Sequence, residues 1–222
     1  MIPRELIASA QVPGGGTLSL YRRNADFMIV LERDELMSSR MSGSEEALAT
    51  LACDRLGVNK APRILVGGYG MGFTLRALLA RLGPGARITV AELVPEVIDW
   101  ARGPMAHLAA GCLDDPRVTI AIGDVGEVIA AGPAQWDAML LDVDNGPDGL
   151  TRADNDALYS NRGLATARAA LRPNGTLAIW SAAPDPAFTK RLRGAGFDVE
   201  EVKVRARQNG KGPTHTIWLA GR

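Results

Sequence analysis

The sequence predicts an α/β fold with a mostly parallel sheet. Apolar, strand-like runs alternate with amphipathic helix-like stretches over residues 59–222, and this alternation is typical of βαβ units. The runs at 64–67 and 138–141 are wholly apolar, as expected for strands whose two faces are both covered. Right-handed crossovers between such strands place the loops that follow them at one edge of the sheet, where ligands bind in folds of this kind.

The order of the remaining elements supports this fold. Strands are expected at 63–67, 87–93, 117–124, 136–144 and 176–182, and helices at 72–83, 95–105, 155–171 and 185–195. A closing antiparallel pair is expected at 198–207 and 214–221, around a turn at Asn209 and Gly210.

Residues 1–58 have a different pattern and are expected to form an abbreviated N-terminal segment that packs on the main domain, residues 59–222. Its predicted elements are strands at 17–23 and 26–35, paired as a hairpin around residues 24–26, and a helix at 43–56. Ser44 is a residue type that can cap this helix.

Composition narrows the function classes. Lys plus Arg and Asp plus Glu both number 25, so the formal net charge is zero and gives no reason to expect nucleic acid or an anionic membrane as a partner. The two cysteines and two histidines are dispersed, which argues against a Cys/His zinc site and favours a reducing compartment. No run approaches the ~20 apolar residues of a membrane span, and no signal-peptide pattern opens the chain. We therefore expect a cytoplasmic protein with a small-molecule substrate, and leave a homodimer open.

A glycine-rich loop follows the first predicted strand of the main domain. Gly68, Gly70 and Gly72 stand in the stretch GGYGMG, directly before a predicted helix. Glycine lets a ligand approach bare backbone, and a helix N-terminus adds unpaired N–H groups. The spacing departs from the dinucleotide fingerprint G-x-G-x-x-G/A at Phe73. We expect Gly68, Tyr69, Gly70 and Gly72 to contact a ligand; the alternative is a tight turn without one.

Carboxylates and a glycine stand at the ends of the next two strands. Glu92, followed by Leu93, ends the second strand and can accept hydrogen bonds from a ribose diol. Asp124, preceded by Gly123, ends the third strand and can bind an adenine amino group, cap the following helix, or do both. Together with the glycine loop, these residues outline a pocket for an adenosine-bearing ligand.

The fourth strand ends in a cluster of acidic residues. Asp142 is the first choice for a catalytic base or a carboxylate that orients the substrate, and it also borders the predicted cofactor pocket. Asp144 could anchor an amine; the alternative is a solvated turn, because DNGPDG is rich in turn formers. The pattern Asp-x-Asp-Asn also permits a metal site, but we expect no metal.

The run VGGYGMG, with VAELVPEVIDWAR, DPRVTIAIGD, WDAMLLDVDNGP and ALRPNGTLAIWS after it, resembles the class I S-adenosylmethionine-dependent transferases, and within them the spermidine synthase group. The resemblance covers roughly residues 26 to 182. It implies a Rossmann-like methyltransferase fold with a seven-stranded sheet and an antiparallel last strand. It also implies that Glu92 holds the ribose and Asp124 the adenine, and that Asp142 stands in the position of the synthases' catalytic aspartate.

Two departures from the spermidine synthase pattern bear on the reaction. Those enzymes carry GGGDGG, whose aspartate helps bind the amine of decarboxylated S-adenosylmethionine, whereas this chain has Gly70 at that place. Their DSSDP segment corresponds to DVDNGP here. We therefore favour methyl transfer from S-adenosylmethionine to a small nucleophile. Aminopropyl transfer from decarboxylated S-adenosylmethionine, a non-catalytic nucleoside-binding protein and, last, an NAD-dependent oxidoreductase are the alternatives.

Overall fold

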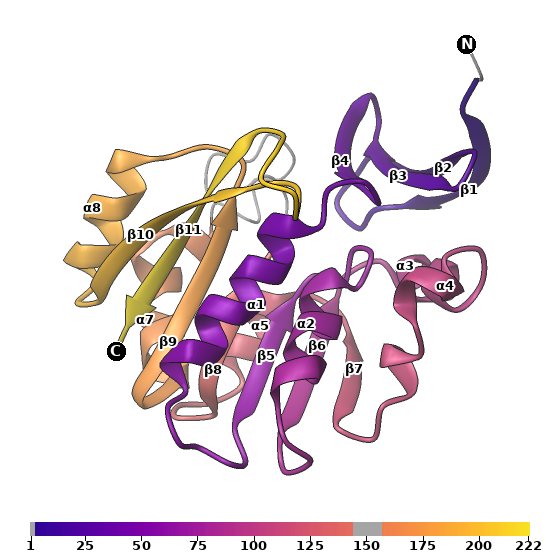
Figure 1. Ribbon diagram of the computed structural model, residues 1–222. Coiled ribbons are helices and arrows are strands. Elements are labelled where there is room, and N and C mark those ends of the chain that lie inside the picture. The colour runs from indigo at the N-terminus through magenta and orange to yellow at the C-terminus, as the bar shows by residue number, and fades with distance from the viewer. Residues whose placement is uncertain (1–2, 144–156) are drawn as a thin grey trace.

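A seven-stranded sheet forms the centre of the protein in the computed structural model, which describes residues 3–143 and 157–222 (Figure 1). The strand order is β10-β11-β9-β8-β5-β6-β7. The strands are β5 (Arg63–Gly67), β6 (Arg87–Glu92), β7 (Val118–Ile122), β8 (Trp136–Leu141), β9 (Leu171–Ser181), β10 (Asp198–Arg205) and β11 (Thr214–Gly221). Among the described strands of this sheet, β11 alone runs antiparallel to its neighbours. The predicted α/β fold with an antiparallel last strand is confirmed.

Helices cover both faces of this sheet, which explains the apolar runs in the sequence. Along β5, Ile64 and Val66 join one buried cluster with α1 (Gly43–Arg55) and α2 (Phe73–Arg81). Leu65, between them, joins a second cluster with α5 (Val125–Ala130), α7 (Asn161–Ala170) and α8 (Pro186–Gly194). Because successive side chains of a strand point to opposite faces, a strand buried on both faces must be apolar at every position.

The remaining described helices follow β6. They are α3 (Pro95–Arg102), α4 (Ala106–Ala109) and the short 3-10 helix η1 (Cys112–Asp114). No helix among the described residues is long and apolar enough to cross a membrane.

The N-terminal segment forms a four-stranded antiparallel sheet, larger than the hairpin that the sequence predicted. Its strands are β1 (Glu5–Gln11), β2 (Thr17–Arg23), β3 (Asp26–Leu31) and β4 (Asp34–Ser38). The run predicted as one strand over 26–35 is divided at Glu32, which has a φ of 53°. The Glu32 carboxylate accepts a hydrogen bond of 2.6 Å from the backbone N–H of Thr17, and this contact holds the turn that separates β3 from β4.

Two helix starts differ from the prediction. Ser42, not Ser44, takes the N-cap position of α1, because Ser44 is buried and its hydroxyl bonds to Glu45 and His215. The helix predicted over 155–171 is divided at Ser160. Residues 157–159 are helical, and α7 begins anew at Asn161, because the Ser160 hydroxyl accepts a hydrogen bond from Gly163 N–H and caps the helix there.

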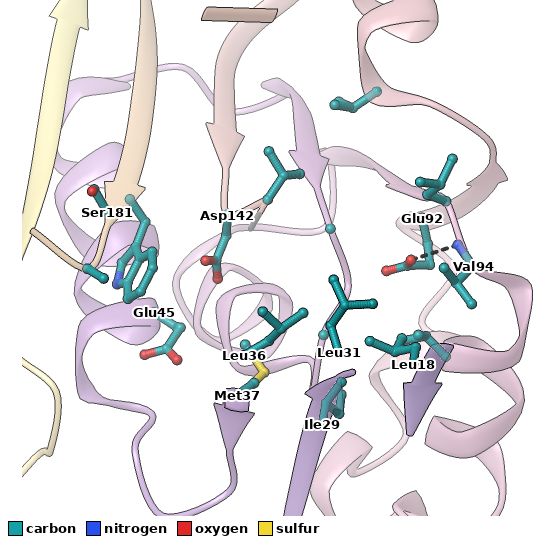
Figure 2. A pocket seen from close by; sticks show the side chains of 18 of the residues that line it. Leu18, Ile29, Leu31, Leu36, Met37, Glu45, Glu92, Val94, Asp142 and Ser181 are labelled. Carbon is teal, nitrogen blue, oxygen red and sulfur yellow. Dashed lines mark hydrogen bonds between the residues drawn. The ribbon is translucent and has the colours of Figure 1, made fainter. Parts of the chain in front are cut away.

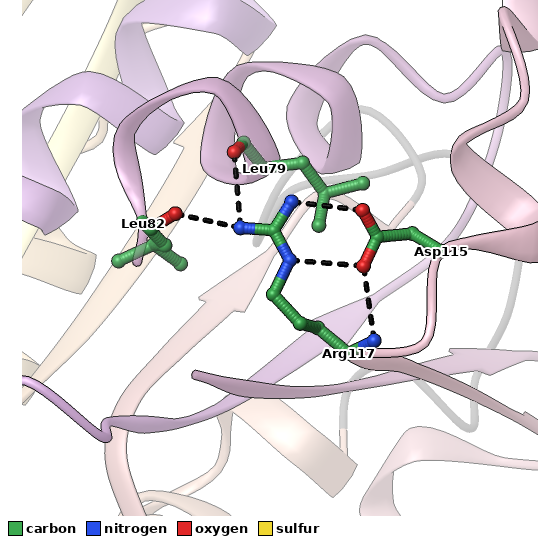
Figure 3. A network of polar contacts seen from close by, with 4 residues as sticks. All are labelled: Leu79, Leu82, Asp115 and Arg117. Carbon is green, nitrogen blue, oxygen red and sulfur yellow. Dashed lines mark hydrogen bonds and ion pairs between the residues drawn. The ribbon is translucent and has the colours of Figure 1, made fainter. Parts of the chain in front are cut away.

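Arg117 joins the end of α2 to the start of β7 (Figure 3). Its guanidinium donates hydrogen bonds to the carbonyl oxygens of Leu79, at 3.2 Å, and Leu82, at 2.6 Å. These carbonyls lie in the last turn of the helix and have no partner within it. The guanidinium also pairs with both carboxylate oxygens of Asp115, and these bonds lower the pKa of Asp115 to about 2.

We expect Arg117→Gln to lower the free energy of unfolding by about 1–3 kcal/mol, because the carbonyls of the α2 end lose a charged donor. Urea denaturation followed by circular dichroism measures this change. Arg87→Gln is the matched control, since the Arg87 residue is exposed on the neighbouring strand, and surface changes of this kind stay within about 0.5 kcal/mol. Equal effects of the two substitutions would contradict the role given to Arg117.

Candidate active site

A cavity of 610 Å³ lies between the carboxyl ends of the parallel strands and the N-terminal sheet (Figure 2). The loops after β5, β6, β7, β8 and β9 line one side of it. The other side is apolar and comes mainly from the N-terminal sheet, with Leu18, Ile29, Leu31, Leu36 and Met37. The cavity therefore lies between the two sheets, at the carboxyl ends of the parallel strands, where the sequence predicted that a ligand binds.

The glycine loop brings backbone to the cavity surface. Gly68 and Gly70 line the cavity and have φ angles of 83° and 55°. Gly68 N–H donates a hydrogen bond of 2.8 Å to the carbonyl oxygen of Ala91. A Cβ atom on Gly68 would lie 2.6 Å from the carbonyl oxygen of Asp142, so only glycine fits between the ends of β5 and β8.

The space beside Gly70 is filled from β4. A Cβ atom at position 70 would lie 2.8 Å from Cε and 2.9 Å from Sδ of Met37. Together with the positive φ, this contact leaves no room for a carboxylate side chain at position 70 while Met37 keeps its place. The N-terminal sheet therefore packs directly against the glycine loop at Gly70.

Glu92 ties the glycine loop to the end of the neighbouring strand. Its carboxylate accepts hydrogen bonds of 2.9 Å from the backbone N–H groups of Tyr69 and Val94, and the Val94 bond is drawn in Figure 2. The side chain lines the cavity and is only 7% exposed. Burial raises the pKa of Glu92, and the backbone N–H bonds oppose that rise. The backbone N–H groups of Leu93 and Gly70 also interact with this carboxylate, so a ligand hydroxyl would share it with the backbone of the loop.

Tyr69 and Gly72 are placed behind the loop and do not line this cavity. The Tyr69 side chain is buried, and its hydroxyl lies 3.5 Å from Sγ of Cys112. Gly72 takes the N-cap position of α2, and a Cβ atom there would lie 2.6 Å from the Tyr69 hydroxyl. Both residues therefore support the loop on the side away from the cavity. The backbone N–H of Tyr69 donates a hydrogen bond to Glu92.

Leu93, Gly123 and Asp124 all line the cavity beside Glu92. Asp124 caps α5, since its carboxylate accepts a hydrogen bond of 2.6 Å from Gly126 N–H. Within the described residues, its other carboxylate oxygen accepts no hydrogen bond, so the same group can cap the helix and bind a ligand.

Asp142 lines the cavity just after β8. Removal from water raises its pKa well above the ordinary range; the charge of Glu45 adds to this rise, and a hydrogen bond with Thr74 opposes it. Asp144, the second predicted catalytic residue, lies outside the described residues.

Glu45 was not predicted as a site residue. It lines the cavity from α1 and is 6% exposed. Burial raises its pKa to well above the usual value for a glutamate. A signal for it exists in the sequence: Leu48, Ala49 and Ala52 form the buried stripe of α1, and Glu45 precedes them at helical spacing, on the same face.

The charge of the cavity has one sign. The acidic side chains that line it are Glu35, Glu45, Glu92, Asp124, Asp142 and Asp185, whereas none of its described lining residues is lysine or arginine. His215 is buried, and this burial lowers its pKa and favours the neutral ring. Within the described residues, no three side chains of the metal-binding types are gathered as a metal site would require.

Comparisons of the sequence with known proteins agree with this architecture. Residues 44–192 match the family model of the spermine/spermidine synthase domain. The chain is 35% identical over 168 residues to a polyamine aminopropyltransferase of Mycobacterium tuberculosis, an alignment that covers 71% of this chain and 30% of that protein. It is 32% identical over 116 residues to putrescine N-methyltransferase 2 of Nicotiana tabacum, covering 52% of this chain and 31% of that protein. The chain thus spans about a third of the length of these curated relatives.

Solved structures share the fold. The spermidine synthase of Thermotoga maritima superposes with a TM-score of 0.76 at 17% identity, over 97% of this chain and 72% of that one. The 1,6-didemethyltoxoflavin-N1-methyltransferase of Burkholderia thailandensis, solved with 1,6-didemethyltoxoflavin and S-adenosylhomocysteine, gives a TM-score of 0.58 at 22% identity, over 83% and 79% of the two chains. The expected Rossmann-like methyltransferase fold is confirmed. With the family model matching most of its length, the chain belongs to the spermine/spermidine synthase family.

Proposed function

We propose that this chain is an S-adenosylmethionine-dependent transferase that moves a methyl group to a small amine. The observation that carries the proposal is the acidic cavity at the glycine loop, whose described lining contains no lysine or arginine. A cationic sulfonium and a cationic amine both suit such a site, whereas a dinucleotide brings two phosphate groups that the site does not neutralise.

The nucleoside is assigned to the side of the cavity formed by β6 and β7. Glu92 would accept from the ribose hydroxyls beside the backbone N–H groups that already contact it. Asp124 would face the adenine while it caps α5. Leu93 and Val94, which also line this side, supply apolar contact for the ring.

Asp142 would handle the proton of the acceptor. S-adenosylmethionine supplies a methyl group already bonded to a good leaving group, so the protein has mainly to position and deprotonate the nucleophile. An ammonium N–H bond breaks as the proton moves to the Asp142 carboxylate. The amine nitrogen then forms a bond to the methyl carbon, while the S–C bond breaks and its electron pair stays on sulfur.

Methyl transfer is preferred to aminopropyl transfer because of Gly70. A carboxylate at this place would help to bind the amine of decarboxylated S-adenosylmethionine, and Met37 occupies the space that it would need. The family contains relatives named for each reaction: a polyamine aminopropyltransferase and a putrescine N-methyltransferase. Aminopropyl transfer therefore stays the second candidate, with a different carboxylate of the cavity as the amine ligand.

Titration calorimetry separates these candidates by their cofactor. We expect S-adenosylmethionine and S-adenosylhomocysteine to bind, decarboxylated S-adenosylmethionine to bind more weakly, and NAD not to bind. Tighter binding of the decarboxylated form would favour aminopropyl transfer. Absence of binding by every sulfonium ligand would overturn the proposal as a whole.

Glu92→Gln tests the assignment of the ribose. We expect the affinity for S-adenosylhomocysteine to fall by about 10- to 100-fold, because hydrogen bonds to a charged acceptor are lost. Glu127→Gln is the matched control, since Glu127 is exposed on α5 and does not line the cavity. Thermal melts of both variants report whether the loop still folds. A folded Glu92→Gln protein with unchanged affinity would remove Glu92 from the site.

The raised pKa of Glu45 makes stability depend on pH. The unfolded chain has a glutamate pKa of about 4.3, so the folded protein binds this proton more tightly, and stability is lost as the pH rises from about 4 through the folded-state pKa. At pH 8.5 we expect Glu45→Gln to raise the free energy of unfolding by about 1–3 kcal/mol, which corresponds to a melting temperature several degrees higher. At pH 5 the substitution should change the melting temperature little. Glu127→Gln, a change of an exposed glutamate that does not line the cavity, is the control. An effect of Glu45→Gln that is equal at both pH values would contradict this origin.

A further inference from the structure

We propose that Glu45 works with Asp142 as a pair of acid–base groups, and that Ser44 and His215 are positioning residues that hold Glu45 in this role. The use of the pair in catalysis rests on the proposed function, because it needs an acceptor that must lose a proton. The pair itself is a property of the protein alone.

The two carboxyl groups reach one cavity from different elements. Asp142 follows β8, Glu45 comes from the first turn of α1, and both line the cavity. Figure 2 shows their carboxylates facing the same space, on the side away from Glu92. Thr74 of α2 connects them, since its hydroxyl interacts with Asp142 and lies 3.4 Å from the Glu45 carbonyl oxygen. The pair therefore occupies the acceptor side of the site assigned above.

Glu45 is held by a chain of hydrogen bonds that ends on β11. Ser44 Oγ lies 2.7 Å from Glu45 Oε2 and 2.9 Å from His215 Nδ1. The His215 ring packs edge-on against Trp180, with a centroid distance of 4.7 Å. Ser44, Glu45 and His215 are all buried, so the direction of the Glu45 side chain is fixed by partners and not by solvent.

This series of hydrogen bonds can form in both protonation states of Glu45. When Glu45 is ionised, the Ser44 hydroxyl donates to it and accepts from His215 Nδ1–H. When Glu45 carries a proton, it can donate to Ser44, which then donates to the unprotonated Nδ1 of the other imidazole tautomer. A serine hydroxyl both donates and accepts, and a neutral histidine can place its proton on either nitrogen. In both states the Ser44 hydroxyl keeps one donor contact and one acceptor contact with these two neighbours.

Surrounding charges favour one shared proton. From α1, Glu46 adds a further negative charge that raises the pKa of Glu45; from α2, Thr74 opposes the rise for Asp142; and β11 contributes the neutral His215. The described cavity lining offers no lysine or arginine as a counter-charge. Two carboxylates in one poorly solvated site cannot both ionise without a large penalty, so near neutral pH they titrate as a unit.

A shared proton gives the pair a net charge of −1, which matches an arriving ammonium group. The ammonium N–H bond breaks and its proton goes to the ionised carboxylate, so both carboxyl groups are then protonated. The neutral amine now faces a neutral pair, and its lone pair is free to attack the methyl carbon. Neither carboxyl group is then ionised, so neither binds the amine nitrogen as an ion pair that would oppose its attack.

Carboxyl-carbon NMR titration of the full chain, between pH 4 and 10, tests the pair. Signals are assigned by their loss in Glu45→Gln and Asp142→Asn. We expect both carboxyl groups to titrate well above the ordinary value of about 4, in coupled steps. Glu45→Gln should lower the midpoint of Asp142 by about one pH unit or more, and Asp142→Asn should lower that of Glu45 by a similar amount, since the coupling is reciprocal. If one variant does not fold, the other measures the same coupling.

The positioning residues are tested in the same experiment. Ser44→Ala and His215→Leu should raise the midpoint of Glu45, because its ionised form loses support, whereas His215→Asn, which keeps a polar atom near Nδ1, should restore it. Glu127→Gln, at an exposed residue outside the cavity, is the control and should leave the midpoint of Asp142 in place. An unchanged Asp142 midpoint in Glu45→Gln, or ordinary midpoints for both groups, would overturn the proposal. Coupled titration in a protein that binds no sulfonium would instead overturn the proposed function and leave the pair standing.

Discussion

The carboxylate of Glu92 is the contact on which the site depends. It stands at the end of β6 and accepts hydrogen bonds from Tyr69 N–H of the glycine loop and from Val94 N–H at the start of the next helix. The loop after β5 is thereby held open over the cavity, with Gly68 and Gly70 at its surface. A shorter side chain at position 92 would release both backbone groups at once. In the proposed function the same carboxylate would also meet the ribose, and loop geometry and ligand recognition would then depend on one group.

The N-terminal sheet completes the site and limits its chemistry. Met37 fills the space beside Gly70, and apolar residues of β2 and β3 face the strand ends across the cavity. A site that is acidic on one side and apolar on the other can hold a cationic group by its charge and the remainder of the acceptor by burial. The proposed preference for methyl transfer thus rests on the contact between Gly70 and Met37.

Local patterns predicted the elements that form the side of the cavity to which the nucleoside is proposed to bind, because strand ends and glycine turns are properties of short stretches of sequence. The positions of Glu92 and Asp124 at neighbouring strand ends follow from the βαβ order alone. The acceptor side could not be found in this way. Ser44 and His215 touch although 171 residues separate them, and the reversed direction of β11 brings them together. Ser44 is a residue type that often caps helices, and only its tertiary contact with His215 shows that its hydroxyl is buried. The orientation of Tyr69 likewise depends on Cys112, which belongs to a distant turn.

A crystal structure of the chain with S-adenosylhomocysteine tests the central claim most directly. The account predicts a ribose hydroxyl within hydrogen-bond distance of the Glu92 carboxylate, the adenine beside Asp124, and the thioether sulfur directed toward Asp142. A nucleoside bound elsewhere on the chain, or one bound in the cavity with its ribose away from Glu92, would contradict it.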